Sequence, residues 1–259
     1  MKLKDYTEQN RAAWNEVTPK HLEARGEIQR EKFSARDDIA LDDIVVNKLL
    51  EFGIKDKRVA QLCCNTGIET LSLKKLGAAQ CVGFDISDAA IEEAVSLSEH
   101  LGIPAAFVRT DIYEIPDSYY GQFDIVYISV GTLGWMPDLD RFFLKVTDLL
   151  AEGGSIFMYE MHPIIDMFDE KDKTIVNSYF KATPFIDNGG LDYVGGVQYE
   201  GQTQYWFPHT MSGIIQSMIN YGAQIRYFQE YPHDISNVAG HLESESAPLP
   251  LSYILIGSK

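Results

Sequence analysis

The feature that most constrains the fold of this chain is a regular alternation, between residues 58 and 160, of short apolar runs with segments of helical periodicity. The apolar runs, which we predict to be strands, cover residues 58–63, 80–85, 105–111, 123–129 and 153–160. Predicted helices lie between them at 67–77, 87–102 and 138–150. Strands that alternate with helices form a parallel sheet with helices on both faces, joined by right-handed crossovers. We therefore predict a doubly wound α/β fold.

Helix-terminal signals support these assignments. Ser87 or Asp88 is suited to be the N-cap of its helix, because short polar side chains accept hydrogen bonds from the first free N–H groups. Gly77 and Gly102 are expected to end their helices, since glycine tolerates the left-handed conformation of a C-terminal stop.

The first 55 residues also have helical character. Residues 7–17 have the composition of a helix start, and we expect Pro19 to interrupt that helix because proline lacks a backbone N–H. A second helix is predicted over 37–53, with Ile39 among its apolar positions and Gly53 as its stop.

The alternation breaks after the fifth predicted strand. Residues 162–208 are rich in Gly, Asp, Tyr and Thr, and we predict an insertion, a hairpin or small sheet, that covers the site. A helix then follows at 209–222, with Thr210 as its N-cap, and two strands at 223–231 and 249–258. Because only a loop separates these two strands, we expect them to be antiparallel neighbours.

Charge and cysteine content exclude several kinds of partner. The formal net charge is −16, whereas nucleic-acid backbones and anionic membranes are bound by a surplus of Lys and Arg. The three cysteines, Cys63, Cys64 and Cys81, imply neither a disulfide framework nor a metal site, since no second Cys/His cluster accompanies the adjacent pair. The sequence shows no signal peptide and no membrane-spanning apolar run. We expect a cytoplasmic protein.

Ligands of an open doubly wound sheet bind at the carboxyl ends of its strands, so the residues there are the first candidates for a site. The first strand leads through Cys63-Cys64-Asn65-Thr66-Gly67 into a helix, and small residues at such a turn let the backbone approach a ligand. Asn65 and Gly67 are the positions best able to take a left-handed conformation. An ordinary strand-to-helix turn remains an alternative.

Acidic residues stand at the ends of the next two strands. Asp85 follows Gly67 by 18 residues, close to the spacing of about 20 at which a carboxylate accepts both ribose hydroxyls. Asp111 ends the third strand and can accept from an adenine amine, with Ile112 packing on the ring. Together they indicate a nucleoside ligand, although Asp85 is equally suited to cap the following helix.

The loop after the fourth strand, 129–135, combines small hydroxyl residues with two glycines, which permits close approach of a ligand. Trp135 at its end is a candidate wall of a substrate pocket. Packing of Trp135 in the core under a loop is the alternative.

At these positions the chain resembles the class I S-adenosylmethionine-dependent methyltransferases, over residues 58–160 and in the closing helix and strand pair. The first loop of that family reads acid-x-Gly-x-Gly-x-Gly. Here the corresponding residues are Gln61, Cys63, Asn65 and Gly67, so one glycine is kept and the acid is replaced by an amide without charge. A subgroup with Cys and Asn in this loop, followed by Leu-Ser-Leu, is similar to this sequence.

The resemblance implies S-adenosyl-L-methionine as cofactor, S-adenosylhomocysteine as product, and a strand order 3-2-1-4-5-7-6 with an antiparallel seventh strand. It implies that Asp85 holds the ribose, Asp111 the adenine, and the loop 129–135 the substrate side. The cofactor-binding candidates are Gln61, Cys63, Cys64, Asn65, Gly67, Asp85, Ile86, Asp111, Ile112 and Ser129.

The chain is expected to form one methyltransferase domain, 1–259. Its parts are a helical lid (1–55), a cofactor-binding core (56–160), an insertion that covers the substrate (161–208), and a closing helix with an antiparallel strand pair (209–259).

Methyl transfer to a small-molecule acceptor is an in-line displacement that needs alignment above all, and a base only when the acceptor arrives protonated. His162 and His209 are the candidate bases, because both follow or precede elements whose loops face the ligand edge. Tyr205 and Trp206, beside His209, are candidate substrate contacts. Structural roles for each of these residues remain open.

Two other functions fit parts of the pattern. A NAD(P)-dependent oxidoreductase would share the sheet class, but it favours more glycines after the first strand and a parallel sixth strand. A non-catalytic nucleoside-binding module would keep the ligand site and lack the transfer reaction.

Overall fold

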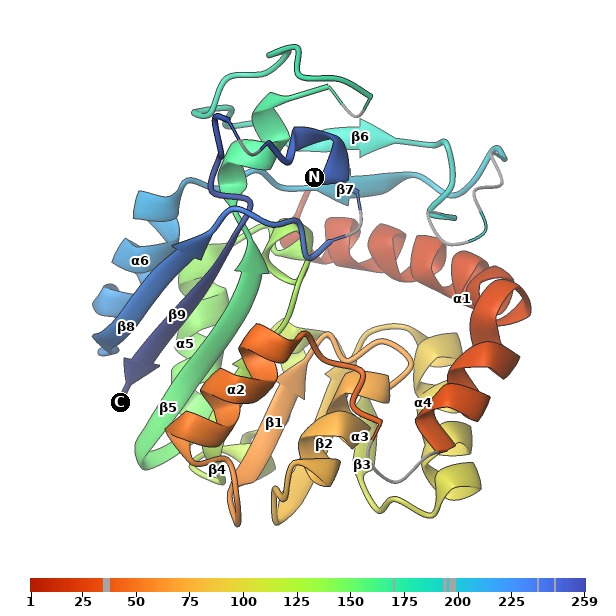
Figure 1. Cartoon of the computed structure of the whole chain (residues 1–259), viewed down its shortest axis with the longest axis vertical. Coiled ribbons are helices and arrows are strands. Elements are labelled where there is room, and N and C mark those ends of the chain that lie inside the picture. The colour runs from red at the N-terminus through yellow and green to blue at the C-terminus, as the bar shows by residue number, and fades with distance from the viewer. Residues whose placement is uncertain (35–37, 170, 193–194, 196–198, 237, 245) are drawn as a thin grey trace.

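A seven-stranded sheet forms the centre of the molecule (Figure 1). The computed structural model describes residues 1–259 except 35–37, 170, 193–194, 196–198, 237 and 245. The strands of the sheet are β1 (Arg58–Leu62), β2 (Gln80–Asp85), β3 (Ala106–Arg109), β4 (Phe123–Ile128), β5 (Leu150–Met161), β8 (Gln224–Tyr231) and β9 (Ser252–Ser258). Their order is β3-β2-β1-β4-β5-β9-β8, and β9 is antiparallel to both neighbours while the other pairs are parallel. The predicted order and the antiparallel last strand are confirmed.

Helices cover both faces of this sheet. They are α1 (Leu3–Ser34), α2 (Asp43–Phe52), α3 (Ile68–Lys75), α4 (Asp88–Leu101), α5 (Leu139–Leu149) and α6 (Met211–Asn220). Because side chains alternate along a strand, Val59 packs in one apolar cluster with α2, and Ala60 packs in another with α5 and α6. Phe142 and Phe143 of α5 are fully buried there, and truncating a buried Phe to Ala costs about 3–5 kcal/mol.

Helix α1 continues through Pro19, so the expected interruption is wrong. The helix instead changes direction along its length (Figure 1). The residues before Pro19 are packed, since Val17 is fully buried and the buried Thr18 donates a hydrogen bond to the carbonyl of Trp14 at 2.7 Å. Tertiary packing therefore outweighs the loss of one intrahelical hydrogen bond.

Helix α2 begins later than predicted. Its N-cap is Asp42, whose side chain accepts the N–H of Ile44, so Ile39 precedes the helix rather than lying on it. Gly53 ends the helix in the left-handed conformation with φ of 86°, as expected. Residue 37, where the predicted helix starts, lies outside the described residues.

The other helix ends follow their signals. Ser87 caps α4 by accepting the N–H of Ala90, Gly102 ends that helix with φ of 62°, and Thr210 caps α6. The last strand starts at Ser252. Residues 249–251, which were predicted to belong to this strand, lie in the loop before it.

The insertion between β5 and α6 contains a short 3-10 helix, Pro163–Met167, and a two-stranded antiparallel sheet of β6 (Phe185–Asp187) and β7 (Gln204–Trp206). The predicted small sheet is therefore present, although residues 193–194 and 196–198 of this segment lie outside the description. Figure 1 shows the insertion at the end of the molecule toward which β1 and β5 point. Within the described residues, no helix has the length and apolar character needed to cross a membrane.

Candidate active site

The loop between β1 and α3 has an unusual backbone. Cys63, Asn65 and Gly67 all adopt positive φ, at 54°, 48° and 77°. The expectation for Asn65 and Gly67 is confirmed, and Cys63 shares the conformation although a cysteine rarely does. The three alternate positions correspond to the glycines of the family pattern, and positive φ is the conformation that glycine tolerates best. At Gly67 a Cβ would lie 2.7 Å from the Phe107 ring, which leaves room only for glycine.

Asp85, at the end of β2, connects this loop to the next helix. One carboxylate oxygen accepts the N–H of Asn65 and the other accepts the N–H of Ser87, both at 2.8 Å. Burial raises the pKa of Asp85, and the N–H donors of Ser87 and Asn65 act in the opposite direction. Each oxygen keeps a further lone pair for a hydroxyl donor. Asp85 does not cap α4, because Ser87 has that role.

Asp111 and Ile112 follow β3. The Asp111 side chain accepts the N–H of Tyr113 at 3.0 Å, and Ile112 is buried with 3% exposure. The N–H of Thr110, which precedes Asp111, donates to the carbonyl of Asp85 at 2.8 Å, so the two acids lie at adjacent strand ends. Burial raises the pKa of the Cys63 thiol, and the carboxylates of Asp85 and Asp111 add to that effect. The ends of three neighbouring strands therefore meet around Cys63.

Gln61 and Ser129 lie next to β4, at one side of the region formed by the strand ends. Gln61 is 1% exposed and donates its amide N–H to Ser129 Oγ at 3.2 Å. Cys64 is buried behind the loop, and a Cβ on Gly83 would lie 2.7 Å from its sulfur. Ile86 is half-buried beside Asp85. The structure thus places all ten predicted cofactor residues along the ends of β1, β2, β3 and β4.

Helix α1 covers the α4 side of this region. Arg11 binds the carboxylate of Asp88 through two hydrogen bonds of 2.9 and 3.0 Å, and Asn15 donates to the same group at 2.9 Å. The hydrogen bond from Asn15 and the Arg11 guanidinium lower the pKa of Asp88. On the other side, Trp14 packs edge-on against Trp135 with ring centroids 5.5 Å apart.

The loop after β4 is held by a buried acid that the sequence reasoning missed. Glu160, at the end of β5, is 2% exposed and accepts the N–H groups of Gly131 and Leu133. Burial raises the pKa of Glu160 to about 7, against the effect of its N–H donors, Gly131 first. A carboxylate that binds several consecutive N–H groups fixes the loop it binds, so Glu160 sets the position of 129–135.

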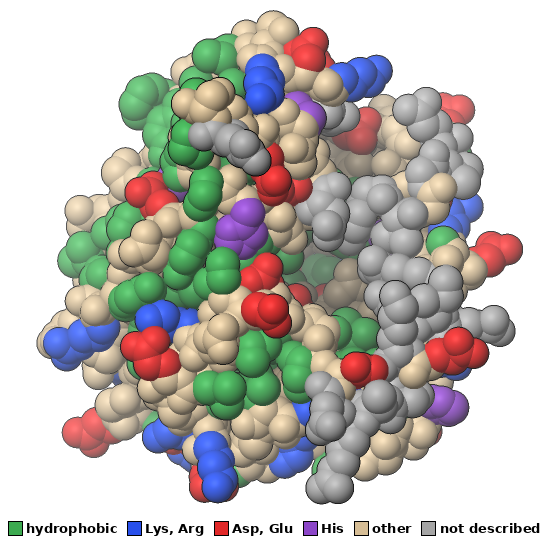
Figure 2. Space-filling view, viewed as in Figure 1, with side chains coloured by type: hydrophobic (Ala, Val, Ile, Leu, Met, Phe, Trp, Pro, Cys, Tyr) green, Lys and Arg blue, Asp and Glu red, His purple; other side chains and the backbone are tan. Residues whose placement is uncertain are grey.

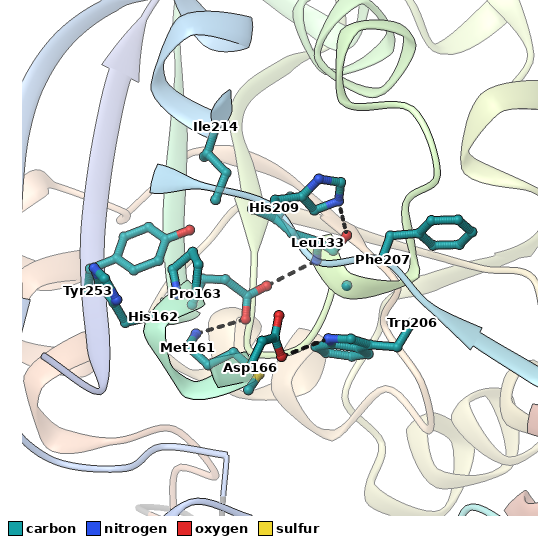
Figure 3. Close-up of a pocket in the computed structure, with 12 residues that line it drawn as sticks. Leu133, Met161, His162, Pro163, Asp166, Trp206, Phe207, His209, Ile214 and Tyr253 are labelled. Carbon is teal, nitrogen blue, oxygen red and sulfur yellow. Dashed lines mark hydrogen bonds between the residues drawn. The ribbon is translucent and has the colours of Figure 1, made fainter. Parts of the chain in front are cut away.

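A pocket opens on the far side of that loop (Figure 3). Its space is about 310 Å³, including the part open to solvent. The lining residues come from the β4 loop, the end of β5, β7 and the residues after it, α6 and β9: Leu133, Gly134, Glu160, Met161, His162, Pro163, Asp166, Trp206, Phe207, His209, Ile214 and Tyr253. Apolar walls with a few convergent polar groups are typical of small-molecule sites.

Trp206, one of the candidate substrate contacts, is a wall of this pocket. It packs edge-on against Trp135 with centroids 5.2 Å apart, and it lies so close to Gly134 that a Cβ there would meet the indole at 2.2 Å. Tyr205 is 8% exposed and packs edge-on against Tyr6 of α1, with centroids 4.9 Å apart. Trp135 and Tyr205 do not line the pocket, so of the three predicted contacts only Trp206 does.

The two candidate bases line the pocket with different hydrogen bonds. His162 accepts the N–H of Ile164 at Nδ1, and its Nε2 lies 3.1 Å from Glu230. Burial lowers the pKa of His162, and Glu230 opposes that effect. Both ring nitrogens are engaged, so this arrangement gives His162 no free lone pair for a base.

His209 has one engaged nitrogen. Its Nε2 lies 3.1 and 3.0 Å from the carbonyl oxygens of Leu133 and Met136, which makes Nε2 the protonated donor (Figure 3). Burial lowers the pKa of His209, which favours the neutral ring. In the described part of the chain Nδ1 has no hydrogen-bond partner, so it keeps a lone pair that a base requires.

Asp166 is a second site residue that the sequence reasoning missed. Its carboxylate accepts the indole N–H of Trp206 at 3.1 Å (Figure 3). Burial raises the pKa of Asp166 to about 6, close to the range in which a carboxylate serves as a base near neutral pH. Only its position inside the short helix after His162 could have drawn attention to it, and that signal is weak.

The surface around the site is acidic but not segregated. Figure 2 shows the described Asp and Glu side chains of this face spread among hydrophobic and basic ones rather than gathered in one patch. The net charge of −16 favours the approach of a cationic ligand through the field of the whole molecule.

Comparisons with known proteins agree with this geometry. A family model described as a methyltransferase domain matches residues 59–154. An S-adenosylmethionine-dependent methyltransferase structure from Listeria monocytogenes has a TM-score of 0.63 and 19% identity, over 83% of this chain and 96% of that chain. One from Methanosarcina mazei has a TM-score of 0.60 and 17% identity, over 85% and 98%.

The fold also occurs in another kind of enzyme. The cyclase SpnF has a TM-score of 0.57 and 16% identity, over 84% of this chain and 81% of that chain. Sequence comparison with curated proteins finds no match. At such identities the structures show a shared fold.

Proposed function

Because this chain belongs to the class I S-adenosylmethionine-dependent methyltransferases, we propose that it methylates a small molecule held in the pocket beside Trp206. It is an enzyme of the transferase class with S-adenosyl-L-methionine as cofactor and S-adenosylhomocysteine as product. When bound, the cofactor supplies a methyl group already activated on a sulfonium. The protein then has to hold and align the reactants and exclude water.

The observation that carries the proposal is the meeting of two sites across one loop. On one side, Asp85 and Asp111 lie at adjacent strand ends beside the β1–α3 loop. On the other, Leu133 and Gly134 line the pocket. The loop between them is fixed by Glu160, which also lines the pocket. A donor at the strand ends and an acceptor in the pocket would have to meet at the edge of this loop, because in-line transfer needs the reacting atoms in contact.

The residues at the strand ends fit the cofactor chemically. The carboxylate of Asp85 suits the ribose diol, because both of its oxygens keep a lone pair beside their N–H donors. Asp111 and the buried Ile112 suit an adenine amine and ring face. Glycine at position 67 lets the loop backbone pack closely against Phe107.

The pocket favours a compact acceptor with a titratable or hydrogen-bonding group. Its apolar walls favour a partly hydrophobic acceptor. Asp166 and Nδ1 of His209 are the two groups placed to take a proton from an arriving acceptor. We rank them above His162, because both nitrogens of His162 are already engaged.

An oxidoreductase is a weaker assignment. The antiparallel β9 replaces the parallel sixth strand that a nicotinamide-binding fold would continue with, and the β1–α3 loop has one glycine where that fold uses three.

The test is transfer of a labelled methyl group from S-adenosylmethionine to extract fractions. We expect label in molecules that pass a filter of about 1 kDa, and not in protein or nucleic acid, because the pocket holds only a small acceptor. Asp85→Asn is the negative control for cofactor use, and Asp117→Asn, at an exposed position, is its matched partner. Label confined to macromolecules would contradict a small acceptor, and no transfer to any fraction would favour a binding module.

A further inference from the structure

The chain has an amide, Gln61, where the family pattern has the acid that faces the ammonium group of the cofactor. In the structure both polar atoms of the Gln61 amide are engaged. Its Oε1 accepts from the hydroxyl of Thr70 at 2.5 Å, and its Nε2 donates to Ser129 and to Glu69. Nε2 is a donor, and Oε1, although it keeps a second lone pair, belongs to a neutral amide, so Gln61 cannot form an ion pair with a cation.

A carboxylate lies next to that amide. Glu69, in the first turn of α3, accepts from Nε2 of Gln61 at 2.9 Å, and it also interacts with the hydroxyl of Ser129. The three side chains link the ends of β1 and β4 with the start of α3. Glu69 as a whole is half-buried.

Among the described residues, Glu69 has no positively charged partner. In the part of the chain that the structure describes, no Lys or Arg forms an ion pair with it, and its hydrogen-bond partners are neutral. Burial raises the pKa of Glu69, because the ionised form is partly removed from water. A carboxylate in this position gains from a cation that enters beside it, and hydrogen bonds between charged groups are about twice as strong as neutral ones.

We propose that Glu69 supplies the carboxylate that pairs with the ammonium group of the bound cofactor, and that Gln61 is a positioning residue that holds Glu69 toward the end of β4. The charge that the family pattern places on β1 is thereby transferred to α3. Its spacing, eight residues after Gln61, explains why a search of the loop itself finds no acid. This inference rests on the cofactor assignment made above.

The test uses calorimetry with S-adenosylhomocysteine and with its analogue that lacks the α-amino group. Glu69→Gln, which keeps the shape, is expected to weaken binding of S-adenosylhomocysteine about 10–100-fold and to leave binding of the analogue within about threefold. Glu99→Gln, at an exposed position of α4, is the matched control and should change neither affinity.

A charge-swap variant separates the ion pair from a purely structural role. Gln61→Glu combined with Glu69→Gln moves the negative charge from position 69 to position 61. This double variant is expected to recover a large part of the lost affinity for S-adenosylhomocysteine. Circular dichroism of each variant checks that the fold is kept. Unchanged binding in Glu69→Gln, or an equal loss for both ligands without recovery in the swap, would overturn the inference alone. Wild-type protein that binds neither ligand would overturn the cofactor assignment and the inference with it.

Discussion

Left-handed backbone at Cys63, Asn65 and Gly67 is the residue-scale property on which the cofactor loop depends. The first two tolerate it with side chains, but Gly67 is also crowded by Phe107 and Ala94, both of which would lie within 2.8 Å of a Cβ added there. Backbone strain and overpacking therefore act together at this one residue.

Gly67→Ala is expected to lower the free energy of unfolding by about 2–4 kcal/mol, of which roughly 1–2 is backbone strain and the rest displacement of the Phe107 ring. Gly102→Ala is the control, since Gly102 has φ of 62° but nothing within 4 Å of an added Cβ. It should cost only about 1 kcal/mol. Urea unfolding measures both, and equal losses would show that the ring contact contributes nothing.

The buried carboxylate of Asp166 is expected to lower the free energy of unfolding when it is ionised. Because burial raises its pKa to about 6, the folded protein holds a proton there between about pH 4 and 6 that the unfolded chain has released, so stability falls as pH rises through that window. Asp166→Asn removes this cost while its oxygen can still accept from Trp206.

We therefore expect Asp166→Asn to be about 1–3 kcal/mol more stable than wild type at about pH 8, with a gain that shrinks toward about pH 4. Chemical denaturation at both pH values measures it, with the exposed Asp117→Asn as control. A variant that is destabilised at the higher pH would show that the carboxylate is stabilising where it lies.

At the residue scale, the sequence predicted the acids at strand ends but not the buried acids within elements. Asp85 and Asp111 were accessible to reasoning because topology alone brings strand ends together. Glu160 lies at the end of a predicted strand, yet its role depends on N–H groups of another loop, and no spacing encodes that. Asp166 and Glu69 became candidates only once burial and partners were known.

At the scale of elements, α1 joins the cofactor side to the insertion. Its Asn10 is 4% exposed and forms two hydrogen bonds with the backbone of Tyr205 in β7, at 2.9 and 2.8 Å. Its Arg11 and Asn15 bind Asp88 at the start of α4. Because α1 is bound both to β7 and to the start of α4, it is expected to restrict the access of ligands to the nearby strand ends.

Asn10→Ala is expected to loosen this tie, because it leaves the N–H and carbonyl of Tyr205 without partners at a cost of about 1–3 kcal/mol. Hydrogen exchange should quicken in β7 and in the first half of α1 while β4 and α5 stay protected. Glu23→Ala, on the exposed side of the same helix, is the control. Uniform exchange across the molecule in both variants would argue against a separate lid.

Element prediction succeeded where local signals and packing agree, as in α4, which starts at its Ser87 cap and ends at Gly102. It failed at Pro19, where the local signal predicts a break and buried neighbours on both sides keep the helix intact. The local sequence shows the proline, which removes one helical hydrogen bond. It does not show the tertiary contacts that compensate for that loss.

At the scale of the whole molecule, the strand order was expected from the resemblance to the methyltransferase family, and only the last strand pair from the residues themselves. A loop without an α-helix favours antiparallel neighbours, and β8 and β9 are antiparallel. The acceptor did not follow, because its pocket collects residues from separate segments that no motif connects. The domain division and the cytoplasmic location stay predictions.

The net charge of −16 is expected to affect the rate at which charged ligands associate with the whole protein. S-adenosylmethionine carries a sulfonium charge that S-adenosylhomocysteine lacks, so the field of the whole protein attracts the first more strongly. Screening shortens the reach of that field to roughly 10 Å at 0.1 M salt. Stopped-flow tryptophan fluorescence should therefore show association of S-adenosylmethionine slowing several-fold between about 0.02 and 0.5 M NaCl, with a shallower decline for S-adenosylhomocysteine. Parallel salt dependences for the two ligands would mean that binding senses only the local carboxylates, Glu69 and Asp85 among them, and not the molecular charge.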